Sequence, residues 1–222
     1  MTYPPMDSLR PAPLQAEPTR GPLAAIAVGL GAVLSFVISP AALHLLRETL
    51  HFNCSWGIGG EWGPEGTWVC ADGIGYLGIV VVLGGATGLL LVAGLLLGIA
   101  RPSLTRSLTF VALAGISLPW TGWWTVYGAT FYTGPRPADE TGLGLWASTI
   151  CAGLSLCVLG LLGGAVGVLT KQRWSPAALW GGAGLMVVGT LLQPGLGVTT
   201  LVGAGLLAAA GVARPRDFVG TR

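Results

Sequence analysis

The feature that most limits how this chain can fold is a series of long apolar segments. Four of them cover residues 23–46, 74–100, 107–130 and 143–170, and a longer fifth region covers 177–213. About 20 helical residues cross the hydrocarbon layer of a membrane, because each residue adds about 1.5 Å. Only 9% of the 222 residues are charged, whereas ordinary soluble domains carry about 25%. The sequence therefore predicts an all-α integral membrane protein.

The last apolar region is too long for a single crossing. Gln193, Pro194 and Gly195 form a polar turn signal near its middle. We therefore expect two short spans, 177–192 and 196–213, which makes a six-helix transmembrane bundle. A re-entrant hairpin would leave both chain ends on the same side and remains open as an alternative.

Short polar segments flank this membrane domain, which we place at residues 22–213. Residues 1–21 are polar and rich in proline, which predicts a disordered tail. They lack the short apolar core of a cleaved signal peptide, so the first span is expected to be an uncleaved anchor. Residues 214–222 form a second short tail.

The basic residues are distributed unevenly along the chain. With the N-terminus inside, nine of the eleven lie on the cytoplasmic side: Arg10, Arg20, Arg101, Arg106, Lys171, Arg173, Arg214, Arg216 and Arg222. Only Arg47 and Arg136 then lie outside, as the positive-inside rule requires. We expect a multi-pass protein of the cell membrane with both termini in the cytoplasm. The preference for Ala, Gly, Leu and Val, with arginine over lysine, is typical of a GC-rich bacterial genome.

Glycines recur at four-residue spacing within the predicted spans. The pairs are Gly84 with Gly88, Gly94 with Gly98, Gly160 with Gly164, and Gly163 with Gly167. This spacing lets helices approach closely, either within one bundle or at a dimer interface. Packing within the bundle is the favoured interpretation.

The outer loop, residues 47–73, contains two cysteines near its membrane ends. Cys54 and Cys70 enclose fifteen residues, and disulfides persist on the outer side of the membrane. We therefore expect an extracytoplasmic loop closed by a Cys54–Cys70 disulfide. Cys151 and Cys157 fall on different faces of one helix and are not expected to pair.

Three tryptophans recur every six residues in this loop: Trp56, Trp62 and Trp68. They could line a cap that binds a ligand or a partner. The favoured alternative is that they enter the headgroup layer or pack on the disulfide.

An aromatic stripe follows the third span at helical spacing: Trp120, Trp123, Trp124, Tyr127 and Phe131. Tyr127 and Phe131 are expected at the outer interface, where aromatic belts occur. Trp120 is deeper, so its indole N–H needs a partner such as Thr121, Thr125 or a carbonyl. One hypothesis is an outward-opening groove bounded by Trp120, Trp123, Trp124 and Tyr127 and roofed by the disulfide loop. It would suit a lipid tail, a quinone or a partner helix; packing against neighbouring helices is the alternative.

A polar cluster ends the first span. His44, Glu48 and His51 are spaced to share one helical face, with Arg47 beside them, and form a weak candidate metal site. The histidines are about 10 Å apart along the axis, which is far for one ion. The favoured alternative is an interfacial helix end with an internal Arg–Glu pair. No cofactor is predicted.

The sequence carries no established catalytic motif and no ionisable residue deep in a span, which argues against ion transport. It has no basic cluster suited to nucleic acid. We therefore expect a non-enzymatic accessory or scaffold subunit that docks onto another membrane protein or onto a second copy. The alternatives are a binder or transporter of an apolar or lipidic ligand, with membrane lipids as partners, and a metal- or quinone-linked redox protein.

Overall fold

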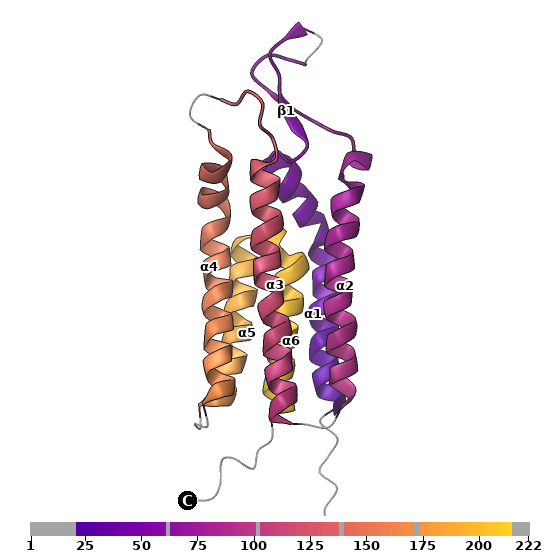
Figure 1. Ribbon diagram of the computed structural model, residues 1–222, viewed down its shortest axis with the longest axis vertical. Coiled ribbons are helices and arrows are strands. Elements are labelled where there is room, and N and C mark those ends of the chain that lie inside the picture. The colour runs from indigo at the N-terminus through magenta and orange to yellow at the C-terminus, as the bar shows by residue number, and fades with distance from the viewer. Residues whose placement is uncertain (1–20, 61–62, 101–102, 138–139, 171–173, 215–222) are drawn as a thin grey trace, which may run out of the picture.

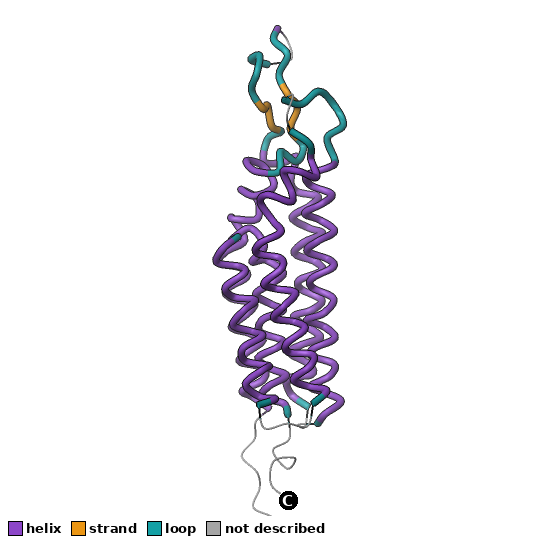
Figure 2. The backbone as a smooth tube through the Cα atoms, turned by 90° about the vertical axis from the view of Figure 1, so that its left-hand side faces the viewer, coloured by secondary structure: helices purple, strands orange, loops and turns teal. Residues whose placement is uncertain are grey.

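The computed structural model describes residues 21–60, 63–100, 103–137, 140–170 and 174–214, and its helices form one elongated bundle (Figures 1 and 2). The helices are α1 Gly21–His44, α2 Leu77–Ile99, α3 Leu104–Thr130, α4 Gly142–Leu169, α5 Ser175–Leu192 and α6 Gly197–Ala213. The predicted all-α bundle is confirmed. The predicted tails, 1–21 and 214–222, lie outside the described residues except for Gly21 and Arg214.

Five of the six helical segments are long and apolar enough to cross a membrane: those of α1, α2, α4, α5 and α6. The remaining helix, α3, has 27 residues but is less apolar. Its polar side chains, including Ser117, Thr121 and Thr125, are buried against the bundle. Thr121 shares a hydrogen bond of 2.6 Å with Thr199 of α6. Ser117 and Thr125 donate to carbonyls of α3 itself, at Ala114 and Thr121, so these three hydroxyls are all hydrogen-bonded inside the bundle.

The centre of the bundle is α6. Within its apolar stretch 83% of the residues are buried, against 39% or fewer in the other four candidate spans. Small residues let its neighbours approach: Gly205 faces the backbone of α1 at Ala27 and Gly31, and Gly203 faces Ser117 of α3. This close packing explains why a helix of only 17 residues organises the core.

The predicted division of the last apolar region is confirmed as two helices. A short 3₁₀ turn, η5 Pro194–Leu196, joins α5 to α6. Figure 1 shows this turn ending below the level reached by α3 and α4. The difference follows from length, since α4 has 28 residues and α5 only 18.

Five of the eight glycines in these pairs pack within the bundle, which is the arrangement favoured from the sequence. A Cβ on Gly160 would lie 2.5 Å from the Gly182 carbonyl oxygen of α5, and one on Gly98 would lie 3.0 Å from Ala25 of α1. Gly84, Gly88 and Gly163 differ, because no described atom lies within 4 Å of a Cβ built on them.

Two arginines donate hydrogen bonds to carbonyls at the C-terminal ends of helices, at the end of the bundle where α1 begins and α6 ends. Arg106 donates to the Gly98 carbonyl of α2 at 2.7 Å, and Arg214 donates to the Thr170 carbonyl after α4 at 2.6 Å. These carbonyls have no amide partner within their own helices. Of the nine basic residues predicted to be cytoplasmic, the structure describes these two. They lie near the start of α3 and just after α6, at the end of the bundle far from the disulfide loop.

Beyond the other end of the bundle lies a small antiparallel hairpin (Figure 2). It pairs β1 Cys54–Trp56 with β2 Trp68–Cys70, and Cys54 is directly opposite Cys70. The predicted disulfide joins these two residues. Cys151 and Cys157 are not bonded to each other, also as predicted.

Candidate functional site

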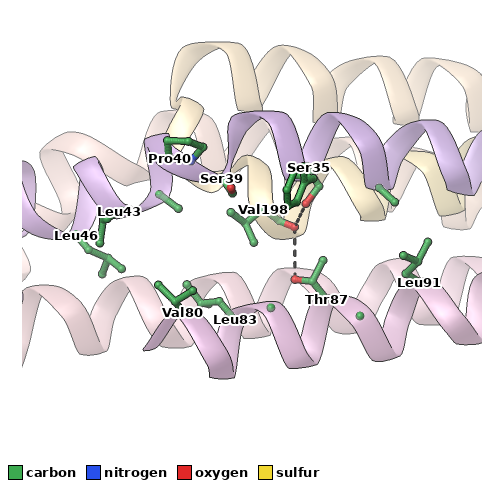
Figure 3. A pocket seen from close by; sticks show the side chains of 15 residues that line it. Ser35, Ser39, Pro40, Leu43, Leu46, Val80, Leu83, Thr87, Leu91 and Val198 are labelled. Carbon is green, nitrogen blue, oxygen red and sulfur yellow. Dashed lines mark hydrogen bonds between the residues drawn. The ribbon is translucent and has the colours of Figure 1, made fainter. Parts of the chain in front are cut away.

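A lateral slot opens between α1 and α2 in the half of the bundle nearest the disulfide loop (Figure 3). It has a volume of about 550 Å³, within the usual range of small-molecule sites of roughly 300–1,000 Å³. We call it the α1–α2 slot. It is lined by Ala32, Ser35, Phe36, Ser39, Pro40, Ala42, Leu43, Leu46, Val80, Leu83, Gly84, Thr87, Gly88, Leu91 and Val198.

The slot exists because α1 and α2 touch at one end and separate at the other. Near the end with Arg106, Gly98 packs on Ala25 and Gly94 packs on Val28. Toward the loop, Figure 1 shows α1 leaning away from α2. Pro40 lies in this part of α1. Proline has no N–H to donate and its ring pushes against the preceding turn, which bends a helix.

The helix past Pro40 is also irregular. Residues Leu45–Thr49 form a π-helical turn, η2, in which the amide of Leu50 bonds to the carbonyl of Leu45. This turn brings Leu46 and Leu50 against α3 at Gly128, where a Cβ would lie 2.8 Å from Leu46. The loop-proximal part of α1 therefore packs on α3, which leaves the space beside α2 open.

Two of the α2 residues that line the slot are glycines. Gly84 and Gly88 both line it without a side chain, so part of the wall is bare backbone. The glycine pair that does not pack within the bundle is thus the pair that gives the slot its width.

Polar groups in the slot are few. Ser35 donates to the Val198 carbonyl at 2.5 Å, and Thr87 donates to the same oxygen at 3.5 Å. The remaining hydroxyl in the lining belongs to Ser39. Among the residues that the structure describes, no charged side chain lines the slot.

The residues of the predicted aromatic groove do not share one environment. Trp123 is 68% exposed and Trp124 is 3% exposed, although they are adjacent. Tyr127 is exposed. Trp120 is half-buried and packs against the cluster of buried apolar residues at the loop end of the bundle. The stripe therefore crosses the boundary between the outer surface and the core. A groove formed by all four side chains stays a prediction.

The threonines proposed as partners for Trp120 are used elsewhere. Thr121 bonds to Thr199, and Thr125 accepts a hydrogen bond of 3.0 Å from the indole of Trp146 on α4. Within the described part of the chain, the indole nitrogens of Trp120 and Trp124 are buried without a hydrogen-bond partner. The expectation that Trp120 bonds to Thr121, Thr125 or a carbonyl is therefore wrong for the described residues, because α6 gives Thr121 another partner and α4 gives Thr125 another donor.

The residues of the predicted polar cluster at the end of the first span do not stay together in the structure. Arg47 and Glu48 form the expected pair, with 3.3 Å between Nε and Oε1. His51 does not continue the helical face, because its φ of 53° turns the chain out of the helix. Across the described residues, no group of three or more His, Cys, Asp or Glu side chains is placed to hold a metal ion. The structure thus does not bring His44, Glu48 and His51 together.

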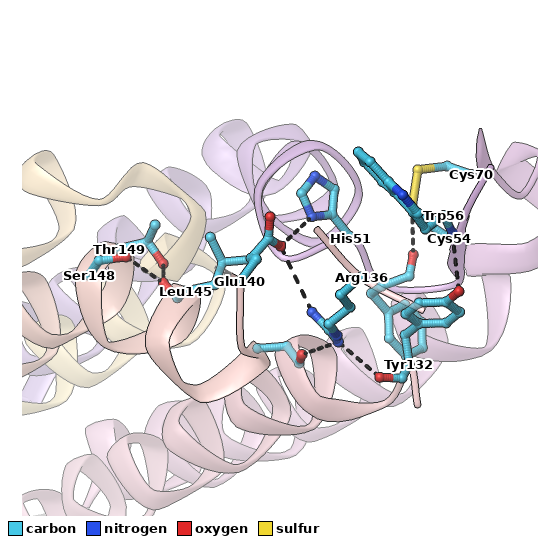
Figure 4. Close-up of polar contacts among 12 residues, drawn as sticks. His51, Cys54, Trp56, Cys70, Tyr132, Arg136, Glu140, Leu145, Ser148 and Thr149 are labelled. Atoms are coloured by element: carbon cyan, nitrogen blue, oxygen red, sulfur yellow. Dashed lines mark hydrogen bonds and ion pairs between the residues drawn. A yellow bond between two sulfur atoms is a disulfide. The ribbon is translucent and has the colours of Figure 1, made fainter. Parts of the chain in front are cut away.

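His51 instead joins a cluster that links the disulfide loop to the α3–α4 loop (Figure 4). We call it the outer cap; its members are His51, Trp56, Trp68, Tyr132, Arg136 and Glu140. The imidazole stacks on Trp68, with centroids 4.2 Å apart, and its Nδ1 lies 3.5 Å from Glu140 Oε1. Burial lowers the pKa of His51 below its ordinary value, and Glu140 opposes this shift. The outer cap is a contact between segments far apart in sequence.

Aromatic and cationic groups complete the outer cap. Trp56 and Tyr132 both meet the Trp68 ring edge-on, at centroid distances of 5.3 and 5.4 Å. Arg136 lies 5.8 Å from the Trp68 ring and donates to the Ala129 carbonyl at the end of α3. Trp56 and Trp68 therefore pack within the loop, close to the disulfide. Trp62 lies outside the described residues.

Sequence reasoning missed the α1–α2 slot. Two signals were present: Pro40 inside the first apolar run, and the four-residue spacing of Gly84 and Gly88. Comparisons of this chain with protein-family models, curated proteins and solved structures find no match.

Proposed function

We propose that this protein binds an elongated apolar or lipidic molecule in the α1–α2 slot. The observation that carries the proposal is that α1 and α2 are in contact at Gly98 and yet enclose about 550 Å³ farther along. The slot spans Val80 to Leu91, which is about 16 Å of helical rise. A narrow apolar space of that length suits an extended chain better than a compact polar solute.

We further propose that all six helices cross the cell membrane, with both termini in the cytoplasm and the disulfide loop outside. The unequal distribution of basic residues supports this orientation. The slot then lies toward the outer leaflet, and its ligand enters sideways from the membrane. Lipids of that leaflet are the expected source.

Two glycines allow a matched test of the slot. Gly88→Leu places a side chain into it, whereas Gly85→Leu places the same side chain on α2 outside the lining residues. Neither added Cβ meets a described atom within 4 Å, so both variants are expected to fold. Each protein is purified in mild detergent, and its bound lipids are extracted and identified by mass spectrometry.

We expect a discrete lipid species to accompany the native protein and Gly85→Leu, and to be depleted in Gly88→Leu. Equal lipid content in all three proteins would contradict binding in the slot. Docking onto another membrane protein, the function first expected from the sequence, makes a different prediction for the same purification. A second protein would then be retained in fixed proportion by the native chain, and Gly88→Leu would lose no lipid species.

A further inference from the structure

The hydroxyl groups of the α1–α2 slot are not equivalent. Ser35 of α1 and Thr87 of α2 both donate to the Val198 carbonyl of α6, so these two hydrogen bonds link three helices beneath the slot. Figure 3 shows the Ser39 hydroxyl at the slot with no hydrogen bond to any residue drawn. Ser39 thus presents an uncommitted donor and acceptor in an otherwise apolar space.

Pro40 removes the amide donor of one hydrogen bond in the turn that contains Ser39. In a regular helix the carbonyl of Phe36 accepts from the amide of residue 40, but Pro40 has no N–H. Phe36 and Ser39 are three residues apart, so they occupy the same helical face, and both line the slot. The proline therefore leaves the Phe36 carbonyl without the amide partner that a regular helix supplies, one turn before Ser39.

The position of this polar pair limits the ligand's head group. Ser39 lies ten residues before Thr49, where η2 ends, and so between two and three helical turns from the loop. No Lys, Arg or His side chain lines the slot within the described ranges. A charged group at that depth would be unpaired, which is strongly unfavourable in an apolar environment. Phosphate and carboxylate head groups are therefore disfavoured at this point.

We infer that the α1–α2 slot selects an uncharged amphiphile with a long apolar chain and a single hydroxyl group, of the long-chain alcohol class. The ligand hydroxyl donates to the Phe36 carbonyl and accepts from Ser39, while its chain lies along Gly84 and Gly88. This inference rests on the proposed function, because it requires that the slot holds an apolar ligand.

The test is competition for labelling by a photoreactive long-chain alcohol, using purified protein in nanodiscs. Three competitors have the same chain length: tetradecanol, tetradecane and myristate. Tetradecanol is expected to compete best, since the alkane has no hydroxyl and myristate carries a charge. One uncharged hydrogen bond changes affinity by roughly three- to tenfold.

Two serine variants separate recognition from general effects of substitution. Ser39→Ala is expected to weaken tetradecanol by roughly three- to tenfold and to leave tetradecane unchanged. Ser148→Ala removes an exposed hydroxyl on α4 that bonds to the Leu145 carbonyl, and is expected to change neither. Pro40→Ala restores an amide partner for Phe36 and is expected to lower the preference for the alcohol as well.

The outcomes distinguish the inference from the proposed function. Equal competition by the three compounds, or an unchanged alcohol preference in Ser39→Ala, would overturn the hydroxyl selectivity while Gly88→Leu still blocks labelling. Labelling that persists in Gly88→Leu at the level of Gly85→Leu would instead overturn binding in the slot itself.

Discussion

The imidazole of His51 lies nearly parallel to the indole of Trp68, with 12° between the planes and 4.2 Å between the centroids. His51 follows the first membrane helix, and Trp68 begins the second strand of the disulfide hairpin. The stack therefore holds the hairpin against the end of the bundle. Glu140, from the α3–α4 loop, approaches the same imidazole.

This contact predicts a pH-dependent stability of the outer cap. Burial lowers the pKa of His51 in the folded protein below its ordinary value near 6.5. As the pH falls below that value, the unfolded chain takes up the proton first, so protonation favours unfolding. The contribution of His51 is complete above the unfolded pKa and is lost as the pH falls toward the folded pKa. Thermal unfolding followed by tryptophan fluorescence at a series of pH values measures it.

His51→Phe keeps a flat ring for stacking and removes the titration. Its unfolding temperature should depend less on pH than that of the native protein. His44→Phe, which changes the histidine outside the outer cap, serves as the control and should retain the native pH dependence. An identical pH profile in His51→Phe and the native protein would contradict this role.

The disulfide predicts a loss of stability on reduction. Cys54→Ser with Cys70→Ser opens a loop of fifteen residues, which lowers the free energy of unfolding by about 3 kcal/mol in the chain-entropy picture. The measurement is thermal unfolding in detergent with and without a reductant. The double variant should not respond to the reductant, and a native protein that is fully reduced yet equally stable would contradict the prediction.

The contact between α4 and α5 predicts unequal effects of two alanine substitutions in the same helix. A Cβ on Gly160 would meet the Gly182 carbonyl oxygen at 2.5 Å, so Gly160→Ala should lower stability by about 1–3 kcal/mol. Gly163→Ala meets no described atom within 4 Å and should be neutral or stabilising by up to about 1 kcal/mol. Unfolding temperatures of the two purified variants decide this, and equal destabilisation would refute the packing assignment.

The proposed orientation predicts the accessibility of single cysteines at opposite ends of the bundle. Glu65 is exposed in the disulfide loop, and Thr105 is exposed near the start of α3. In a background lacking Cys151 and Cys157, Glu65→Cys should react with a membrane-impermeant maleimide in intact cells. Thr105→Cys should react only after the membrane is permeabilised. The reverse pattern would place the loop inside the cell.

Local sequence features predicted much of the fold. The apolar runs located the helices, the Gln193–Gly195 turn separated α5 from α6, and the spacing of Cys54 and Cys70 gave the disulfide. These features succeed because each depends on residues close together in the chain. The Arg47–Glu48 pair was predictable for the same reason.

Features that depend on distant residues were not predictable. Sequence spacing predicts His51 on one helical face with Glu48, but a positive φ turns it toward Trp68 and Glu140. Sequence spacing predicts Thr125 as a partner for Trp120, but the indole of Trp146 on α4 donates to it instead. In both cases the side chain had several chemically suitable partners, and the arrangement of other elements selected one.

The sequence by itself determined that this chain forms apolar helices and a loop closed by a disulfide, because hydrophobicity and cysteine spacing are local properties. Only the tertiary structure decided that α6 lies at the centre and that α1 and α2 separate beyond Gly94. Nearly uniform apolar helices have no polar face to indicate which side is inward. Their neighbours are selected by the fit of small residues and by the bend at Pro40, and these become apparent when the helices are packed together.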